Sequence, residues 1–402
     1  MNKKHLFLTA AVFFIMTGLF AATSFSGYAG GKLNYAANPD EEDFDPDLRL
    51  QAFFAGQFNF SQNVWSHLEF SINTNDLLAQ SIFHETESLF QIDEISLIAR
   101  ANLYSSANYV SAFMGTYDPI GSDIFLQRYF NIKPINSKIT ESYLGLAGSI
   151  LYPHFGIGIS DVIKMYTQPL AFGGYIYLNH EDEDYYVLNT DLRFASVLSY
   201  FTCDFAGGLG IPLADKYKDE DVIIAVEKLY WHAGTTILIG NNYTNSLFIQ
   251  GGIYNASFRA REESAIVAPE DVYLLVEPRF LLKNVHLNIT MYSLPEQTVE
   301  KLLFIDDTLG LDLNIYSDAS VNSAPLTYGA HFAVSLIGKN FNDLKDIADF
   351  DTDDMNVNFI PYIESQFLSG QLHLQAKVRF MDLIHERTGK AFSVDLGYRT
   401  KF

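Results

Sequence analysis

The chain of 402 residues has a single cysteine, Cys203, which rules out a framework of intramolecular disulfides. It has few basic side chains, because 26 Lys and Arg stand against 48 Asp and Glu, giving a formal net charge of −22. Nucleic acid is therefore not an expected partner, since binding it requires a positive surface that displaces counterions. The sequence has no HExxH, GxSxG, P-loop or cysteine cluster. It is predicted not to be an enzyme and to need no cofactor.

The one long apolar run lies at the N-terminus, where Lys3 and Lys4 precede an uncharged stretch from residue 6 to residue 20. Small residues follow, an order typical of a secretory signal peptide. The run is shorter than the ~20 residues that a membrane-spanning helix needs. We expect cleavage after Ala29, with a site nearer Ala22 as the alternative. Residues 1–29 are therefore predicted to be the signal peptide, and residues 30–402 a single domain.

The rest of the chain alternates apolar and polar residues instead of repeating them with a helical period. In the closing segment Phe392, Val394 and Leu396 fall on one side of a strand, while Ser393 and Asp395 fall on the other. The same period of two recurs along most of the chain. Clear examples are 48–61, 94–103, 188–198, 272–282, 285–292, 309–316, 328–336, 355–367 and 371–380. Half-buried strands are thus predicted to dominate an all-β fold.

The length of the alternating segments and the charges within them favour a membrane barrel over a soluble β-sandwich. Many alternating segments are longer than the ~5–6 residues typical of strands in soluble proteins. Aromatic residues gather near their ends, as expected of interfacial girdles. Full charges stand on the polar side of strand interiors, where a wet lumen accepts them. The candidates for lining a pore are Arg49, Glu94, Arg100, Asp191, Arg193, Glu277, Arg279, Asp312, His373, Lys377, Arg379 and Arg399.

The C-terminal sequence "VDLGYRTKF" ends on an aromatic residue, with Gly397, Tyr398 and Phe402 in register. It resembles the C-terminal signature of outer-membrane β-barrel proteins of diderm bacteria, a group that includes the porins. The resemblance implies that an outer-membrane assembly machinery recognises these residues. It also implies a closed antiparallel barrel integral to the bacterial outer membrane, in contact with membrane lipids and a lipopolysaccharide-type outer leaflet.

Turns of two lengths set the expected number of strands. Short turns near residues 61, 106, 153, 198, 243, 283 and 369 alternate with longer polar connections. Outer-membrane barrels pair short periplasmic turns with longer external loops. In this scheme 31–38 supplies the first strand, and 155–178 is a weak pair. The result is an up-and-down barrel of 18 strands, an even number as bacterial barrels require, with 16 as the alternative.

A barrel of this size is too wide for its side chains to fill, so a water-filled channel is expected. We expect a porin-like channel for passive diffusion of small hydrophilic solutes or ions. Basic residues on the second and last two strands face acidic ones elsewhere, which predicts either a transverse field or simply solvated charges. The loop 119–137 either folds into the lumen or covers its mouth. Two alternatives remain: a transporter for hydrophobic compounds with an N-terminal plug, and a surface adhesin or structural barrel with acidic loops and a blocked lumen.

The acidic loops raise the question of a metal. Asp349, Asp351 and Asp353 alternate in a spacing that could gather oxygen ligands around calcium. The glycine and the bidentate Glu of an EF-hand are lacking. Solvated surface loops are the favoured interpretation, and no metal site is expected.

Overall fold

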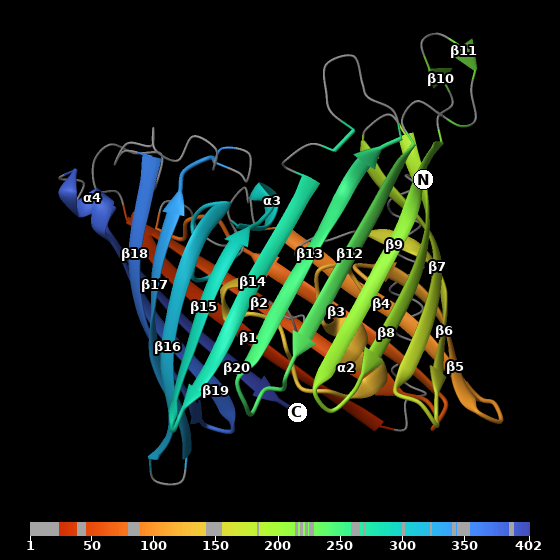
Figure 1. Ribbon diagram of the computed structural model, residues 1–402, viewed down its shortest axis with the longest axis horizontal. Helices are drawn as coiled ribbons and strands as arrows, with labels where there is room; N and C mark the ends of the chain where they lie inside the picture. Colours follow the sequence, from red (N-terminus) through yellow and green to blue (C-terminus); the bar gives the residue numbers. More distant parts are fainter. Residues whose placement is uncertain are drawn as a thin grey trace.

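The computed structural model describes residues 24–37, 46–78, 89–141, 155–182, 185–213, 216–217, 220–221, 224, 229–258, 266–267, 271–299, 302–321, 324–339, 343, 354–385 and 390–402. Eighteen antiparallel strands from these residues form one closed sheet (Figure 1). The antiparallel barrel with 18 strands that the alternation and the turns predict is confirmed.

The strands and helices have the following bounds. The barrel strands are β1 (Ser24–Ala37), β2 (Pro46–Asn59), β3 (Val64–Asn73), β4 (Leu89–Asn102), β5 (Ser106–Gly115), β6 (Gly156–Met165), β7 (Leu170–Asp182), β8 (Tyr185–Val197), β9 (Phe201–Leu213), β12 (Tyr230–Ile239), β13 (Ser246–Ser257), β14 (Val272–Leu282), β15 (Val285–Ser293), β16 (Leu309–Val321), β17 (Ala324–Leu336), β18 (Met355–Phe367), β19 (Gly370–Arg379) and β20 (Phe392–Lys401). A separate hairpin joins β10 (Lys216–Tyr217) to β11 (Glu220–Asp221). The helices are α2 (Ile124–Phe130), α3 (Glu296–Val299), α4 (Phe380–Ile384) and the 3-10 turn η1 (Lys138–Thr140). Within the described ranges, none of the helices has the length and apolar character needed to cross a membrane.

The first and last strands close the barrel. Leu33 of β1 lies opposite Leu50 of β2 on one side and opposite Leu396 of β20 on the other. The backbones of Gly27 and Phe402 exchange two hydrogen bonds of 3.0 Å. Because the first strand pairs on both sides, the sheet has no open edge there, which stabilises the barrel without a disulfide.

The outer wall of the barrel is apolar, as the alternation predicts. Leu192 is 75% exposed, Ile159 59% and Phe332 44%, and each belongs to the outward set of its strand. Exposed apolar side chains recur on strands around the ring, and examples are Leu33, Phe90, Val110, Phe172, Ile176, Phe205, Phe280, Met291, Leu311, Ile363, Leu374 and Leu396. A closed sheet that is apolar outside and polar inside is the architecture of a transmembrane barrel.

The two ends of the barrel differ. Short turns at 60–63, 103–105, 166–169, 198–200, 240–245, 283–284 and 368–369 lie at the same end as the C-terminus, which we call the turn end. The longer connections lie at the opposite end, the loop end. The predicted alternation of short turns and longer connections is therefore confirmed for these turns, except for the turn at 166–169, which was not predicted.

The weak pair predicted at 155–178 is found as two strands, because β6 ends at Met165 and β7 begins at Leu170. The turn at 166–169 separates them, and Tyr166 N donates a hydrogen bond to Ser105 O of the neighbouring turn. Residues 138–140, which follow the connection predicted at 119–137, form η1. The turn predicted near residue 153 lies outside the described residues.

Strand β1 starts earlier than predicted, at Ser24 instead of residue 31. Its early residues include Gly27, Ala29 and Gly30, which carry no apolar and polar alternation. Gly30 is needed for close approach to the last strand, because a Cβ atom there would lie 2.4 Å from Tyr398 O. The expected cleavage point after Ala29 therefore falls inside a described strand, and residues 1–23 lie outside the described part of the chain.

Candidate functional site: the barrel lumen and its two inner loops

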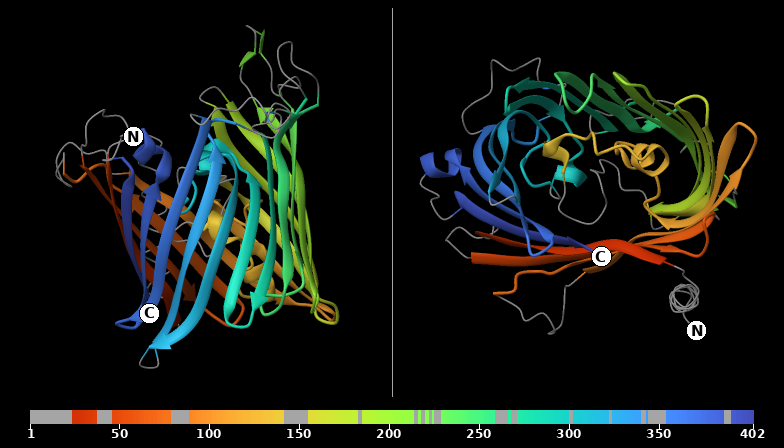
Figure 2. Two further views of the ribbon diagram at one scale, coloured as in Figure 1. Left: turned by 60° about the vertical axis from the view of Figure 1, so that its left-hand side comes forward. Right: turned by 90° about the horizontal axis from the view of Figure 1, so that it is seen from below.

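A long connection folds into the barrel. We call its described part, residues 116–141 between β5 and β6, inner loop 1. Seen from below, its helix α2 lies inside the ring of strands (Figure 2). Phe125 and Leu126 of α2 are fully buried and share one apolar cluster with Ile98 of β4 and Val162 of β6. Of the two arrangements expected for 119–137, the structure shows the inward one.

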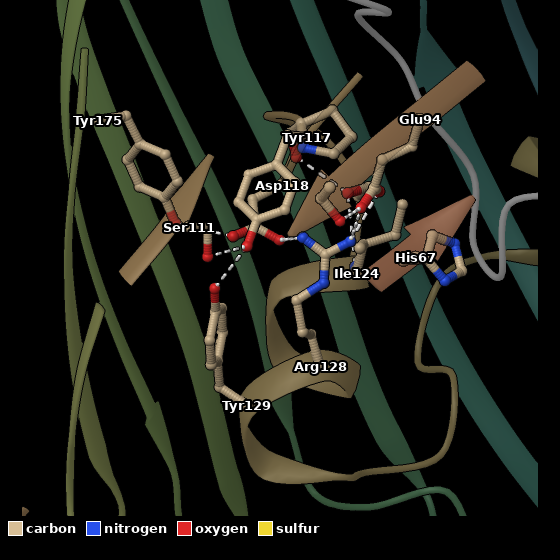
Figure 3. A network of polar contacts seen from close by, with 12 residues as sticks. His67, Glu94, Ser111, Tyr117, Asp118, Ile124, Arg128, Tyr129 and Tyr175 are labelled. Carbon is tan, nitrogen blue, oxygen red and sulfur yellow. Dashed lines mark hydrogen bonds and ion pairs between the residues drawn. The ribbon is translucent and has the colours of Figure 1, made fainter. Parts of the chain in front are cut away.

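Arg128 of α2 fastens inner loop 1 to the wall. Its Nη2 lies 2.9 and 2.7 Å from the two carboxylate oxygens of Glu94 on β4, and its Nη1 lies 2.7 Å from Asp118 Oδ1 (Figure 3). The guanidinium carbon also lies 4.2 Å from the centre of the Tyr117 ring. Both carboxylates are fully buried, so Arg128 is the cation that compensates two charges removed from water.

Asp118 ties two further strands to the same loop. Its Oδ2 accepts a hydrogen bond of 2.9 Å from Tyr175 of β7, and its backbone oxygen accepts one from Arg193 of β8. Arg193 also contacts Asp204 of β9 in a buried ion pair. Burial raises the pKa of Asp118, although Arg128 and Arg193 act against the rise. Burial likewise raises the pKa of Tyr117 to about 12, so its hydroxyl stays neutral. This hydroxyl donates a hydrogen bond of 2.8 Å to Ser111 Oγ.

The middle of inner loop 1 is folded back on itself by Asp123. This buried carboxylate accepts a hydrogen bond of 2.7 Å from Gln127 and another of 2.7 Å from the backbone N of Ile135. Asn131 ends α2 in the left-handed conformation, at φ 55°, which lets the chain turn. A partly apolar segment with an Asp at the helix start and an Asn at its end thereby makes a compact insert instead of a surface loop.

The far end of inner loop 1 reaches other walls. Ser137 donates a hydrogen bond to Glu277 of β14, and Lys138 Nζ lies 2.6 Å from Glu364 Oε1 of β18. Asn242, in a turn at the turn end, donates to Pro134 O at 3.1 Å. The loop therefore begins at the loop end and runs down the lumen between walls β4, β14 and β18.

A second connection also enters the lumen. Inner loop 2, residues 294–299 and 302–308, joins β15 to β16 and contains α3. Its Phe304 is fully buried, with its ring centre 4.0 Å from that of His331 on β17. Asp306 accepts hydrogen bonds from Lys377 at 2.6 Å and from Arg379 at 3.2 Å, both on β19.

The charge on Asp306 is fixed by these two cations. Burial alone would raise the pKa of this carboxyl, but Lys377 and Arg379 outweigh burial and hold it well below its usual range. Asn358 of β18 adds a hydrogen bond of 2.9 Å to the same carboxylate. Inner loop 2 thus presents an anion to a basic wall, whereas inner loop 1 presents a cation to an acidic one.

The predicted pore-lining residues fall into two groups. Most are buried in contacts with a charged or polar partner: Glu94 with Arg128, Asp191 with His232, Arg193 with Asp204, Glu277 with Arg279, Asp312 with His331, His373 with Glu364, and Lys377 and Arg379 with Asp306. The other group is Arg49, Arg100 and Arg399, which remain partly or largely exposed. Arg49 is paired with Asp47, and its side chain is 51% exposed.

Sequence reasoning missed a set of buried His and carboxylate pairs that face the lumen. His67 lies 3.3 Å from Glu69, His232 2.9 Å from Asp191, and His331 2.8 Å from Asp312. The first pair is separated by two positions on one strand, so the period of two already places both side chains on one face. The other two pairs join different strands, and only the register brings their members together.

The C-terminal residues Gly397, Tyr398 and Phe402 lie at the seam where the last strand pairs with the first. Gly397 lies opposite Lys32 of β1 and His373 of β19. Tyr398 Oη donates a hydrogen bond of 2.8 Å to Leu368 O in a neighbouring turn. The Phe402 ring stacks on Phe25 of β1, with 4.9 Å between ring centres. The aromatic end is therefore packed against the first strand on the outer face.

No metal centre is found among the described residues, in which no group of three or more His, Cys, Asp or Glu side chains could hold an ion. The calcium candidates Asp349, Asp351 and Asp353 lie outside those residues.

Two cavities open at the turn end. The larger, about 670 Å³, extends from the turn residues Asn242 and Thr244 to Ser137 and Glu277. The smaller, about 380 Å³, lies beside Glu364 and Gln371. Arg399 and Lys401 of the last strand line both cavities.

No protein-family model matches the chain, and no curated protein matches it. Among solved structures it is similar to engineered variants of the Rhodopseudomonas blastica porin. Two of these superpose with a TM-score of 0.43 at 11% and 12% sequence identity, and a third with a TM-score of 0.42 at 10%. Each superposition covers 94% of this chain and 99% of the porin.

Proposed function

We propose that the protein is a porin-like channel of the bacterial outer membrane, through which small hydrophilic solutes or ions diffuse passively. One observation carries the proposal. A closed barrel of 18 strands, apolar outside and charged inside, holds inner loops that narrow its lumen. A barrel of that size is too wide to be filled by wall side chains alone, so the inserts control the remaining cross-section.

The proposed mechanism is sieving and electrostatic bias, without covalent chemistry. Most charges of the wall are compensated, some by the inner loops, as Glu94 is by Arg128 and Lys377 by Asp306, and others by wall residues, as Arg193 is by Asp204. A narrow passage with compensated walls favours small solutes over large ones, and leaves charge selectivity to the few uncompensated residues.

A barrel with a blocked lumen, acting as a surface adhesin or structural protein, is the second candidate. It is favoured by the burial of the lumen charges, because Glu94, Asp312 and His331 are fully buried instead of wet. A hydrophobic-compound transporter with an N-terminal plug has less support. Residues 24–37, which would have to form the plug, are the wall strand β1.

Planar-bilayer recording of the refolded full chain separates these candidates. The channel proposal expects discrete, ohmic current steps in potassium chloride. A correctly folded barrel that inserts and stays silent would favour the blocked lumen instead.

We further propose that an export signal is removed ahead of Ser24, near Ala22, and not after Ala29. Supporting this boundary, Phe25 stacks on Phe402 and Gly27 bonds to it through the backbone, contacts that cleavage after Ala29 would remove. Intact-mass measurement of the protein from outer membranes tests the boundary. A mature chain beginning at Gly30 would contradict it.

The remaining expectations follow from the same proposal. The apolar wall would contact membrane lipids and a lipopolysaccharide-type outer leaflet, and Gly397, Tyr398 and Phe402 would be read by the outer-membrane assembly machinery before β20 pairs with β1. The turn end would face the periplasm, as short turns do in bacterial barrels.

A further inference from the structure

Two cations at the turn end stand apart from the rest of the lumen charges. Arg399 and Lys401 lie on the inward face of β20 and line both cavities there, of about 670 and 380 Å³. The larger volume falls in the range of ~300–1,000 Å³ typical of small-molecule sites. There is room beside these cations for a small solute with part of its water shell.

Three carboxylates also line the cavities, and each already has a cation. Glu277 pairs with Arg279 at 2.6 Å, while Glu364 and Glu141 share Lys138 at 2.6 and 3.3 Å. Among the described residues, no carboxylate lies within ion-pair distance of Arg399 or Lys401. Arg399 and Lys401 are therefore two cations on one lumen surface that the described carboxylates leave uncompensated, in a chain with a net charge of −22.

Arg399 is held in place by neutral groups. Its Nη2 donates a hydrogen bond of 2.8 Å to Gln371 Oε1, and its guanidinium carbon lies 6.0 Å from the centre of the Tyr28 ring. Gln371 accepts from one of the five N–H donors of the guanidinium, and the rest have no protein acceptor in the described part. An oriented guanidinium with free donors matches the two oxygens of a carboxylate or phosphate.

We propose that Arg399 and Lys401 form an anion-binding subsite at the turn end, which takes the carboxylate or phosphate group of a small hydrophilic solute. This inference rests on the proposed channel function for its effect on ion flow, but the binding itself does not require a current. Arg399 supplies the forked donors and Lys401 a second, more exposed charge. Ser246 and Asn288, which line the same cavity, offer hydrogen bonds to the uncharged part of the solute.

The first test measures binding to the full chain refolded in detergent, by isothermal titration calorimetry. Succinate and inorganic phosphate are the probes, and glucose is the neutral comparison. Both anions should bind, and the Arg399→Gln/Lys401→Gln variant should lose affinity about tenfold or more, as expected for losing charge-assisted hydrogen bonds. Arg399→Lys keeps the positive charge but loses the paired N–H donors of the guanidinium, so its affinity for the anions should lie between those of the wild type and the double variant. Preference for one anion identifies which oxyanion the subsite takes.

A matched control is Arg100→Gln, because Arg100 is also a partly exposed arginine near the turn end but lines neither cavity. It should bind succinate and phosphate as the wild type does. Equal binding by the wild type and the double variant would overturn the subsite, and so would an equal loss of binding in Arg100→Gln.

The second test measures the reversal potential in a potassium chloride gradient. If the barrel conducts, the double variant should become less permeable to chloride relative to potassium, while Arg100→Gln changes this ratio less. A barrel that binds both anions at Arg399 and Lys401 yet never conducts would retain the subsite and overturn the channel. If the barrel conducts, but the double variant keeps the selectivity and the anion binding of the wild type, the channel proposal is retained and the subsite is overturned.

Discussion

The two inner loops are attached to the wall with opposite charges. Inner loop 1 brings the cation Arg128 to two buried carboxylates, Glu94 and Asp118, one of them on the wall. Inner loop 2 brings the anion Asp306 to two wall cations, Lys377 and Arg379. The attachments also differ in burial, since the Arg128 carboxylates are fully buried while Asp306 remains 25% exposed.

The opposite charges of the two inner loops reflect how charge is distributed over the barrel wall. Acidic residues of the neighbouring strands β3 and β4, Glu69 and Glu94, lie on one side, and basic residues of β19 lie on another. Such a separation of wall charges predicts a transverse electric field across the lumen. Where the inner loops lie, this field is reduced, because each loop carries a charge opposite to that of the wall it contacts. Near Arg399 and Lys401 a described cation pair remains without a carboxylate partner within ion-pair distance.

The largest expected effect comes from removing the cation of inner loop 1. Arg128→Ala leaves the buried carboxylates of Glu94 and Asp118 without the cation that pairs with both, which should lower the free energy of unfolding by about 3–5 kcal/mol. Urea unfolding of the barrel in detergent measures the change. Arg128→Lys keeps the positive charge but loses one of the two nitrogen groups that contact the carboxylates. Its free energy of unfolding should therefore fall less than that of Arg128→Ala. A loss below ~1 kcal/mol for Arg128→Ala would show that α2 is held by its apolar contacts alone.

Removing the anion of inner loop 2 should have a smaller effect. Asp306→Asn leaves Lys377 and Arg379 without their carboxylate, but the site is partly open to water, so we expect a loss of about 1–3 kcal/mol. The same urea measurement applies. Asp307→Asn is the matched control, because Asp307 contacts the neutral residues Ser335 and Asn356 in place of cations. If the control loses as much as Asp306→Asn, the ion pair is not the reason for the loss.

The dependence on pH distinguishes the two attachments further. Since the pKa of Asp306 is held below its usual range, its contribution to stability is complete above the unfolded value of about 3.9 and disappears as pH falls through the lower folded value. The stability gap between wild type and Asp306→Asn should therefore be constant from pH 7 to pH 5 and shrink below pH 4. A gap that already closes between pH 7 and pH 5 would contradict the assignment.

The smallest effect on stability is expected at the far end of inner loop 1. Lys138→Gln removes a partly exposed ion pair with Glu364 and should cost less than ~1 kcal/mol. Its effect should appear in the loop's position instead. Hydrogen exchange of residues 132–141, followed by mass spectrometry, should become faster in this variant. Exchange unchanged from wild type would mean that Ser137 and Asn242 suffice to hold the segment.

Sequence reasoning recovers the barrel because period two is a local property. It places Arg399 and Lys401 on the lumen face without knowledge of any neighbour. The position of the turn at 166–169 was missed because β6 and β7 both alternate, and this turn carries only one clear signal, Pro169. The pairing of Arg128 with Glu94 depends on a loop entering the lumen at a particular height. Nothing in the spacing of residues 34 positions apart encodes that meeting.

The most direct test of the account compares single-channel conductance of the wild type with that of the Arg128→Ala/Lys138→Gln variant, in the same bilayer and salt. Inner loop 1 is then released at α2 and at its far end, while the wall is unchanged. If the loops set the cross-section, the variant should give larger current steps than the wild type. Steps of equal size, from a variant shown by hydrogen exchange to have a loosened loop, would contradict the account.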